Sequence, residues 1–222
     1  MSMAAGASGQ AAVMAGRPVP ARRPRMLRVA LIAVAAAAGV AASALAFSAL
    51  WPGEPPAPQP QRLSAPDAAA ARAVVAQAQR LVSVTPQELG YRLRVAGPIA
   101  GLRGNTDNAT RTITLFVAPT DAPHVVAHDL AHEIGHALDA TRLTAAQRAA
   151  YLRGRGVPAA PWLPGAREVS DYRTGAGDFA EVFALCHAAS PVYRSRLAVR
   201  PQDPCRVLPA QARGTRLGEG DS

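Results

Sequence analysis

The residues best suited to chemistry are His132, Glu133 and His136, an HExxH pattern within the segment 125–140, VVAHDLAHEIGHALDA. Apolar residues recur through this segment at helical spacing. Residues four apart share one face of a helix, so both imidazoles are expected to project to the same side. Two neutral imidazoles at this spacing can hold one Zn²⁺, with Glu133 beside them to take a proton from water. The pattern predicts a zinc-dependent hydrolase, most simply a peptidase.

Two histidines leave a tetrahedral zinc ion short of one protein ligand. A third histidine at the spacing HExxHxxGxxH is absent, because position 139 is Asp and position 142 is Arg. His128 lies one turn before His132, but three ligands at i, i+4 and i+8 would spread too far along a straight helix for one ion. His128 is therefore expected to form hydrogen bonds or to line the cleft.

A better source of the third ligand is the segment 178–189, DFAEVFALCHAA, which has the apolar spacing of a helix. Asp178 and Glu181 lie three apart and face one side. One acid would complete the coordination, and the other would orient a histidine through its second ring nitrogen. Glu181 is favoured as the ligand because its longer side chain lies deeper within the helix. Asp178 stays open as the alternative ligand or as a helix cap.

The HExxH helix followed by 179–183, Phe-Ala-Glu-Val-Phe, resembles the zinc peptidases of the gluzincin type, and most closely the lethal-factor-like peptidase domain. The resemblance covers roughly residues 110–190 and implies a zincin-like fold. In that family the ligand is the first acid of an ExxxE or ExxxD pair. Its place here falls on Gly177, which has no side chain, so the ligand would have to be Asp178 or Glu181.

Tyr172, six residues before Asp178, resembles the tyrosine that precedes the ligand helix in the lethal-factor-like domain. The resemblance implies that its hydroxyl stabilises the oxyanion formed during hydrolysis. The alternative is a tyrosine that only packs against the domain. In the expected reaction Glu133 accepts a proton from water and returns it to the leaving amine.

An uncharged run of 23 residues, 29–51, precedes these motifs and is long enough to cross a bilayer. Five arginines and no acids lie in the head, 1–28, so the positive-inside rule predicts a cytoplasmic N-terminus and an extracytoplasmic remainder. The alternative is a signal peptide cleaved near Ala46, which would give a secreted protein. Both interpretations export the rest of the chain. A proline-rich stalk, 52–66, follows.

The elements around the site follow from further patterns. Two segments, 91–95 and 111–117, alternate apolar and polar residues as half-buried strands do, and the turn-rich segment 101–108 is expected to join them into a small antiparallel sheet. Helices are expected at 64–84, 123–140, 144–154 and 178–189. The predicted fold class is α+β, with one zincin-like metallopeptidase domain at 67–211 and a flexible tail at 212–222.

The net charge of +9 does not indicate a nucleic-acid partner, because the head alone contributes +5 and the remainder is only mildly basic. Cys186 and Cys205 both lie in the exported part, where a disulfide between them is expected. These observations together predict an exported zinc metallopeptidase anchored by one helix. The alternatives are a non-catalytic zinc-binding envelope protein that acts as an interaction module, which Gly177 favours, and an amidase of cell-wall peptides.

Overall fold

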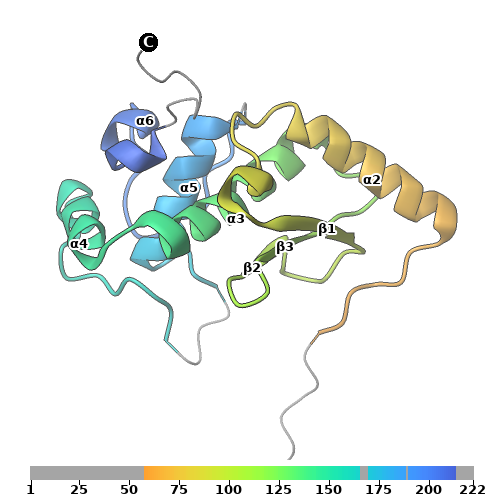
Figure 1. Cartoon of the computed structure of the whole chain (residues 1–222), viewed down its shortest axis with the longest axis horizontal. Helices are drawn as coiled ribbons and strands as arrows, with labels where there is room; N and C mark the ends of the chain where they lie inside the picture. The colour runs from red at the N-terminus through yellow and green to blue at the C-terminus, as the bar shows by residue number, and fades with distance from the viewer. Residues whose placement is uncertain (1–57, 166–169, 189, 214–222) are drawn as a thin grey trace, which may run out of the picture. The chain divides into compact units, whose positions relative to one another are not determined.

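A computed structural model describes residues 58–165, 170–188 and 190–213 (Figure 1). Its fold is α+β, as predicted. The elements in chain order are α2 (Ala65–Gln79), the 3₁₀ helix η1 (Pro86–Leu89), β1 (Arg92–Ala96), β2 (Gly104–Asp107), β3 (Thr112–Phe116), α3 (Pro123–Arg142), α4 (Ala145–Gly154), α5 (Gly175–His187), α6 (Pro204–Val207) and the 3₁₀ helix η2 (Ala210–Ala212).

The sheet has three strands in the order β1-β3-β2 and is mixed. β2 and β3 are antiparallel, with Gly104 opposite Leu115, whereas β1 and β3 are parallel, with Arg92 opposite Thr112. The prediction of a purely antiparallel sheet is therefore wrong. The prediction failed because the segment 101–108, expected to be only a turn, contains β2. β2 pairs antiparallel with β3, and β1 pairs with β3 in parallel on its other side.

The turn between β2 and β3 depends on its polar residues. The Asp107 side chain accepts hydrogen bonds from the backbone N–H groups of Ala109 (2.9 Å) and Thr110 (3.1 Å), and Arg111 adopts a left-handed φ of 50°. An aspartate that caps the backbone two and three residues on is a common way to close a tight turn. This hairpin places β2 at one edge of the sheet.

Helix α3 is central to the domain. It contacts α2, α5, β2 and β3, and in Figure 1 it lies between the sheet and α5. Leu130 and Ile134 on α3 pack in the same buried cluster as Phe179 and Phe183 on α5. At Gly135 the two helices approach closely, since a Cβ there would lie 2.9 Å from the Cα of Ala180. The close packing fixes the HExxH residues relative to α5.

Four of the described helices begin at side-chain caps, among them α6, where the Asp203 side chain accepts a hydrogen bond from the Arg206 N–H. Ser64 caps α2, and Thr144 and Gln147 form a reciprocal capping box on α4. Thr174 caps α5 by accepting a hydrogen bond from the Gly177 N–H. Helix α5 therefore starts at Gly175, three residues before the predicted start at Asp178.

The predicted head, membrane segment and most of the stalk lie outside the described residues, as does the tail from residue 214. Within the described ranges, no helix has both the length and the apolar character needed to cross a membrane. The predicted disulfide is confirmed: Cys186 and Cys205 are bonded, and they join the end of α5 to α6.

Candidate metal centre

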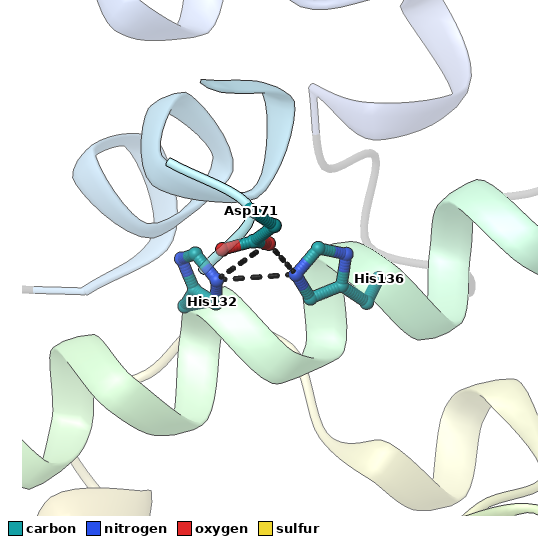
Figure 2. A group of neighbouring side chains, drawn as sticks. All are labelled: His132, His136 and Asp171. Atoms are coloured by element: carbon teal, nitrogen blue, oxygen red, sulfur yellow. Dashed lines mark hydrogen bonds and ion pairs between the residues drawn. The ribbon is translucent and has the colours of Figure 1, made fainter. Parts of the chain in front are cut away.

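Three side-chain donor atoms converge above α3 (Figure 2). The Nε2 atoms of His132 and His136 lie 3.1 Å apart. Asp171, from the loop before α5, places its Oδ2 2.7 Å from Nε2 of His136 and 3.6 Å from Nε2 of His132. Within the described ranges this is the group of side chains whose ligand atoms lie close enough together to hold one metal ion.

The three donors are close enough together to hold a metal ion such as zinc. With ligand bonds of about 2.0–2.2 Å, donors around a tetrahedral zinc ion lie about 3.3–3.6 Å apart. Of the observed separations of 2.7, 3.1 and 3.6 Å, the Asp171–His136 distance would have to widen by about 0.6 Å and the His132–His136 distance by about 0.2 Å. Two imidazole nitrogens and one carboxylate oxygen leave a fourth position open, as in catalytic zinc sites.

Asp171 is held by the N-terminal turn of α5. Its backbone carbonyl accepts hydrogen bonds from the backbone N–H of Thr174 (2.8 Å) and from the Thr174 hydroxyl (2.7 Å). A Cβ at Gly177 would lie 2.2 Å from that carbonyl oxygen and 2.9 Å from Cγ of Asp171. The loop can therefore reach the histidines only because residue 177 has no side chain. Asp171 occupies the space into which a side chain at 177 would project.

Glu181, the favoured third ligand in the sequence analysis, contacts the site from its other side. Its carboxylate is fully buried, and Oε1 accepts a hydrogen bond from Nδ1 of His132 at 2.9 Å. It also accepts hydrogen bonds from Nε2 of His128 and from the backbone N–H of Arg194. Glu181 thus orients His132 through the second ring nitrogen and does not belong to the three-donor group.

Asp178, the other candidate ligand, lies in a separate buried network. Its Oδ2 accepts hydrogen bonds from Nε of Arg155 (2.8 Å) and the hydroxyl of Tyr151 (2.7 Å). Its Oδ1 accepts hydrogen bonds from the hydroxyls of Tyr193 (3.0 Å) and Ser195 (2.6 Å). The network ties α4, α5 and the segment after α5 together, and Asp178 is not part of the three-donor group.

Glu133 projects into the same cavity as the two histidines. The hydroxyl of Thr106 lies 2.7 Å from Oε2 of Glu133 and 2.9 Å from its backbone carbonyl. A Cβ at Gly104 would lie only 2.6 Å from Oε1. Two positions of β2 therefore set the place of the Glu133 carboxylate, one by a hydrogen bond and the other by leaving room.

Tyr172, which follows Asp171 in the sequence, also lines the cavity. Its ring meets that of His132 edge to face, with 5.8 Å between the ring centroids. Burial raises the pKa of Tyr172, against the opposing effect of the nearby His132 and Arg194 charges. The phenol is therefore protonated at neutral pH and can donate a hydrogen bond.

Burial and hydrogen bonding have opposing effects on the pKa values of His132, Asp171 and Glu181. Burial alone would raise the pKa values of Asp171 and Glu181, but hydrogen bonds from the histidines outweigh it and lower both. For His132 burial lowers the pKa, but the hydrogen bonds to the same two carboxylates outweigh it and raise the pKa well above its usual value. Ionised carboxylates on both sides of one imidazole favour a positive charge, which a proton or a metal cation can supply.

The cavity above these residues has a volume of about 330 Å³. β2 and its flanking loops form one wall, and Leu163 and Pro164 form an apolar part of the lining. A further part is polar, where Asp129 accepts hydrogen bonds from Arg194 (2.6 Å) and Arg103 (2.9 Å). The cavity is large enough for a few residues of an extended peptide.

Asp171 was not predicted as a site residue, because residues 170–173 have the composition of an ordinary polar loop. The signal that could have identified the loop was Gly177, since a glycine inside a helix can mark the close approach of another backbone. The structure brings together four of the predicted site residues, which all line the cavity: His132, Glu133, His136 and Tyr172.

Comparison of the chain with protein families, curated proteins and solved structures found no match. The resemblance to the lethal-factor-like peptidase domain therefore stays a prediction from the residues that carry it.

Proposed function

We propose that this chain is a zinc metallopeptidase in which His132, His136 and Asp171 hold the metal and Glu133 is the general base. The observation that carries the proposal is the convergence of three ligand atoms in a cavity that also contains the Glu133 carboxylate. A chance HExxH sequence would not need a carboxylate brought from a distant loop to both imidazoles. It would also not need a strand shaped around the glutamate.

The chain's own residues divide the reaction between them. Glu133 accepts a proton from the attacking water as its oxygen bonds to the carbonyl carbon, and it returns the proton to the amine as the C–N bond breaks. Tyr172 donates a hydrogen bond to the carbonyl oxygen while negative charge develops there. When bound, zinc supplies the Lewis acidity that activates water and polarises the carbonyl.

The position of β2 supports a peptide substrate. The strand order makes β2 an edge strand, and Gly104, Asn105 and Thr106 line the cavity. An extended peptide can add to such an edge through backbone hydrogen bonds, which would hold its scissile bond across the site. Recognition of the backbone in this way favours peptides over other amides.

We also propose that the domain acts outside the cytoplasm. The uncharged run at 29–51, preceded by five arginines, supports export by an anchor or a cleaved signal. The disulfide between Cys186 and Cys205 supports the same conclusion, because such bonds persist in oxidising compartments.

The main reason to consider a non-catalytic zinc-binding module was Gly177, which leaves the expected acidic pair incomplete. Asp171 supplies a carboxylate in that space, so this reason no longer holds. An amidase of cell-wall peptides would use the same residues and would differ only in its substrate. The substrate screen must therefore include cell-wall peptides.

The proposal is tested with the full-length chain and its Glu133→Gln variant. We expect both proteins to bind one zinc ion per chain, because Glu133 is not a ligand. The wild type should cleave members of a peptide library, and the variant should be slower by about 10²–10⁴-fold. Equal cleavage rates would exclude Glu133 as the base, and stoichiometric zinc without cleavage by the wild type would support a binding module.

A further inference from the structure

His128 is fully buried on α3, one turn before His132, and does not take part in the proposed reaction. Its Nε2 lies 3.2 and 3.3 Å from the two carboxylate oxygens of Glu181. The same carboxylate accepts the hydrogen bond from Nδ1 of His132. A continuous chain of contacts therefore runs from His128 through Glu181 to His132.

The environment of Nδ1 of His128 indicates which ring nitrogen donates a hydrogen bond. Its Nδ1 is buried and has no hydrogen-bond partner among the described residues. A buried N–H without an acceptor is costly, whereas an unused lone pair on a neutral ring costs less. The ring proton therefore lies on Nε2, where it is donated to Glu181. His128 therefore has one direction of donation, from Nε2 to the Glu181 carboxylate.

Glu181 is fixed on three sides by this arrangement. It accepts hydrogen bonds from the rings of His128 and His132 and from the backbone N–H of Arg194. A carboxylate with three donors has little freedom to rotate or to retreat from any one of them. Its contact with Nδ1 of His132 keeps the proton on that nitrogen and leaves Nε2 to face His136 and Asp171.

We propose that His128 is a positioning residue for the metal centre. It acts through Glu181 to hold His132 in the ring orientation and tautomer that a metal ligand needs. The inference rests on the proposed zinc site but adds a residue that would touch neither metal nor substrate. It also gives a reason for the histidine at 128, where a leucine would pack without leaving a nitrogen unpartnered.

The test measures the zinc dissociation constant by competition with a chelator, and the melting temperature of the zinc-free protein. For His128→Leu we expect zinc binding about tenfold weaker, at the lower end of the 10–100-fold range for lost supporting partners. His128→Gln should restore binding to within about threefold of the wild type, because its amide can donate to Glu181 in place of Nε2. His128→Asn, one methylene shorter, should not restore it.

The matched control is His187→Leu. His187 is also a buried histidine, but it is hydrogen-bonded to Ser83 and to the carbonyl of Ala212, away from Glu181. This variant should lower the melting temperature and leave zinc affinity unchanged.

Each outcome bears on a separate statement. Wild-type zinc affinity in His128→Leu would overturn the positioning role alone. If that variant does not fold, equal zinc affinity of the Gln and Asn variants would overturn it. Absence of zinc binding by the wild type would instead refute the proposed function, before any variant is compared.

Discussion

Asp171, Asp178 and Glu181 lie close together in the sequence, and their partners separate their roles. Asp171 faces the Nε2 atoms of both site histidines, Glu181 faces Nδ1 of one, and Asp178 pairs with Arg155. A carboxylate can be a ligand, an orienting group or a structural anchor, and we propose these roles for Asp171, Glu181 and Asp178 in that order. The assignment can be tested by removing one charge at a time.

Asp171→Asn and Asp178→Asn should affect different properties of the protein. The first should weaken zinc binding by more than about 100-fold, since a direct ligand is worth more than a supporting partner. The second leaves the buried guanidinium of Arg155 without its ionic partner and should lower the free energy of unfolding by about 3 kcal/mol. Chelator competition and denaturant unfolding measure the two quantities. Strong loss of zinc affinity in Asp178→Asn alone would return the ligand role to α5.

Gly104→Ala should slow catalysis without removing the metal. The added Cβ would overlap Oε1 of Glu133, so the carboxylate must move from its position beside Thr106. We expect kcat to fall by at least about tenfold, the lower part of what a misplaced catalytic group can cost. Gly154→Ala is the control, because a Cβ at that helical position meets nothing and should leave kcat unchanged. Unchanged kcat in Gly104→Ala would show that Glu133 does not need this position.

At the scale of single residues, the sequence predicted what depends on local spacing. His132 and His136 share a helix face, with Glu133 beside them, because of their separation in the chain, so their arrangement followed from the pattern. Asp171 reaches the histidines through a loop whose course is set by packing on Gly177. No local pattern encodes that course, and only the unexpected glycine pointed to it.

At the scale of elements, helices were predicted better than strand pairing. The HExxH helix and the helix capped by Thr144 were found close to their predicted bounds, because caps and apolar spacing act within a few residues. β2 was missed because GNTD contains none of the large or β-branched apolar residues typical of strands. Its glycine and threonine serve Glu133 instead, so the demands of the site weakened the strand signal.

The segment after α5 is held by the disulfide at one end and by α5 carboxylates along its length. Arg194 donates its backbone N–H to Glu181, and its guanidinium donates to Asp129 at 2.6 Å. Residues 187–204, which include Arg194, lie within the loop that Cys186 and Cys205 close. The disulfide therefore limits the freedom of a segment that also supports Glu181.

Replacing both cysteines with serine should lower the free energy of unfolding by about 3 kcal/mol, the loop-closure value for a loop of this length. That loss corresponds to a fall in melting temperature of about 6–12 °C for a domain of this size. Zinc affinity should weaken as well, because the Arg194 N–H would no longer be held beside Glu181. Thermal unfolding of the wild type with and without reductant provides the comparison. A variant that melts as the wild type does would show that the carboxylate contacts alone hold the segment.

At the scale of the whole molecule, the proposed zinc ion would join elements that are far apart in the sequence. His132 and His136 come from the central helix, whereas Asp171 comes from the loop before α5. Ionised Asp171 and Glu181 lie on both sides of His132, and a bound cation compensates their charge. If zinc binds the folded state and not the unfolded chain, it raises the free energy of unfolding by an amount set by the zinc affinity and concentration.

With free zinc at about 1,000 times its dissociation constant, the stabilisation should be about 4 kcal/mol. For a domain of this size it should raise the melting temperature by about 8–16 °C, and a chelator should reverse the gain. His132→Ala combined with His136→Ala should abolish the response, whereas Glu133→Gln should keep it. The contrast matters because Glu133 lies between the two histidines in sequence and in the same cavity, yet it is assigned no bond to the metal. An equal response in all three proteins would place the zinc elsewhere in the chain.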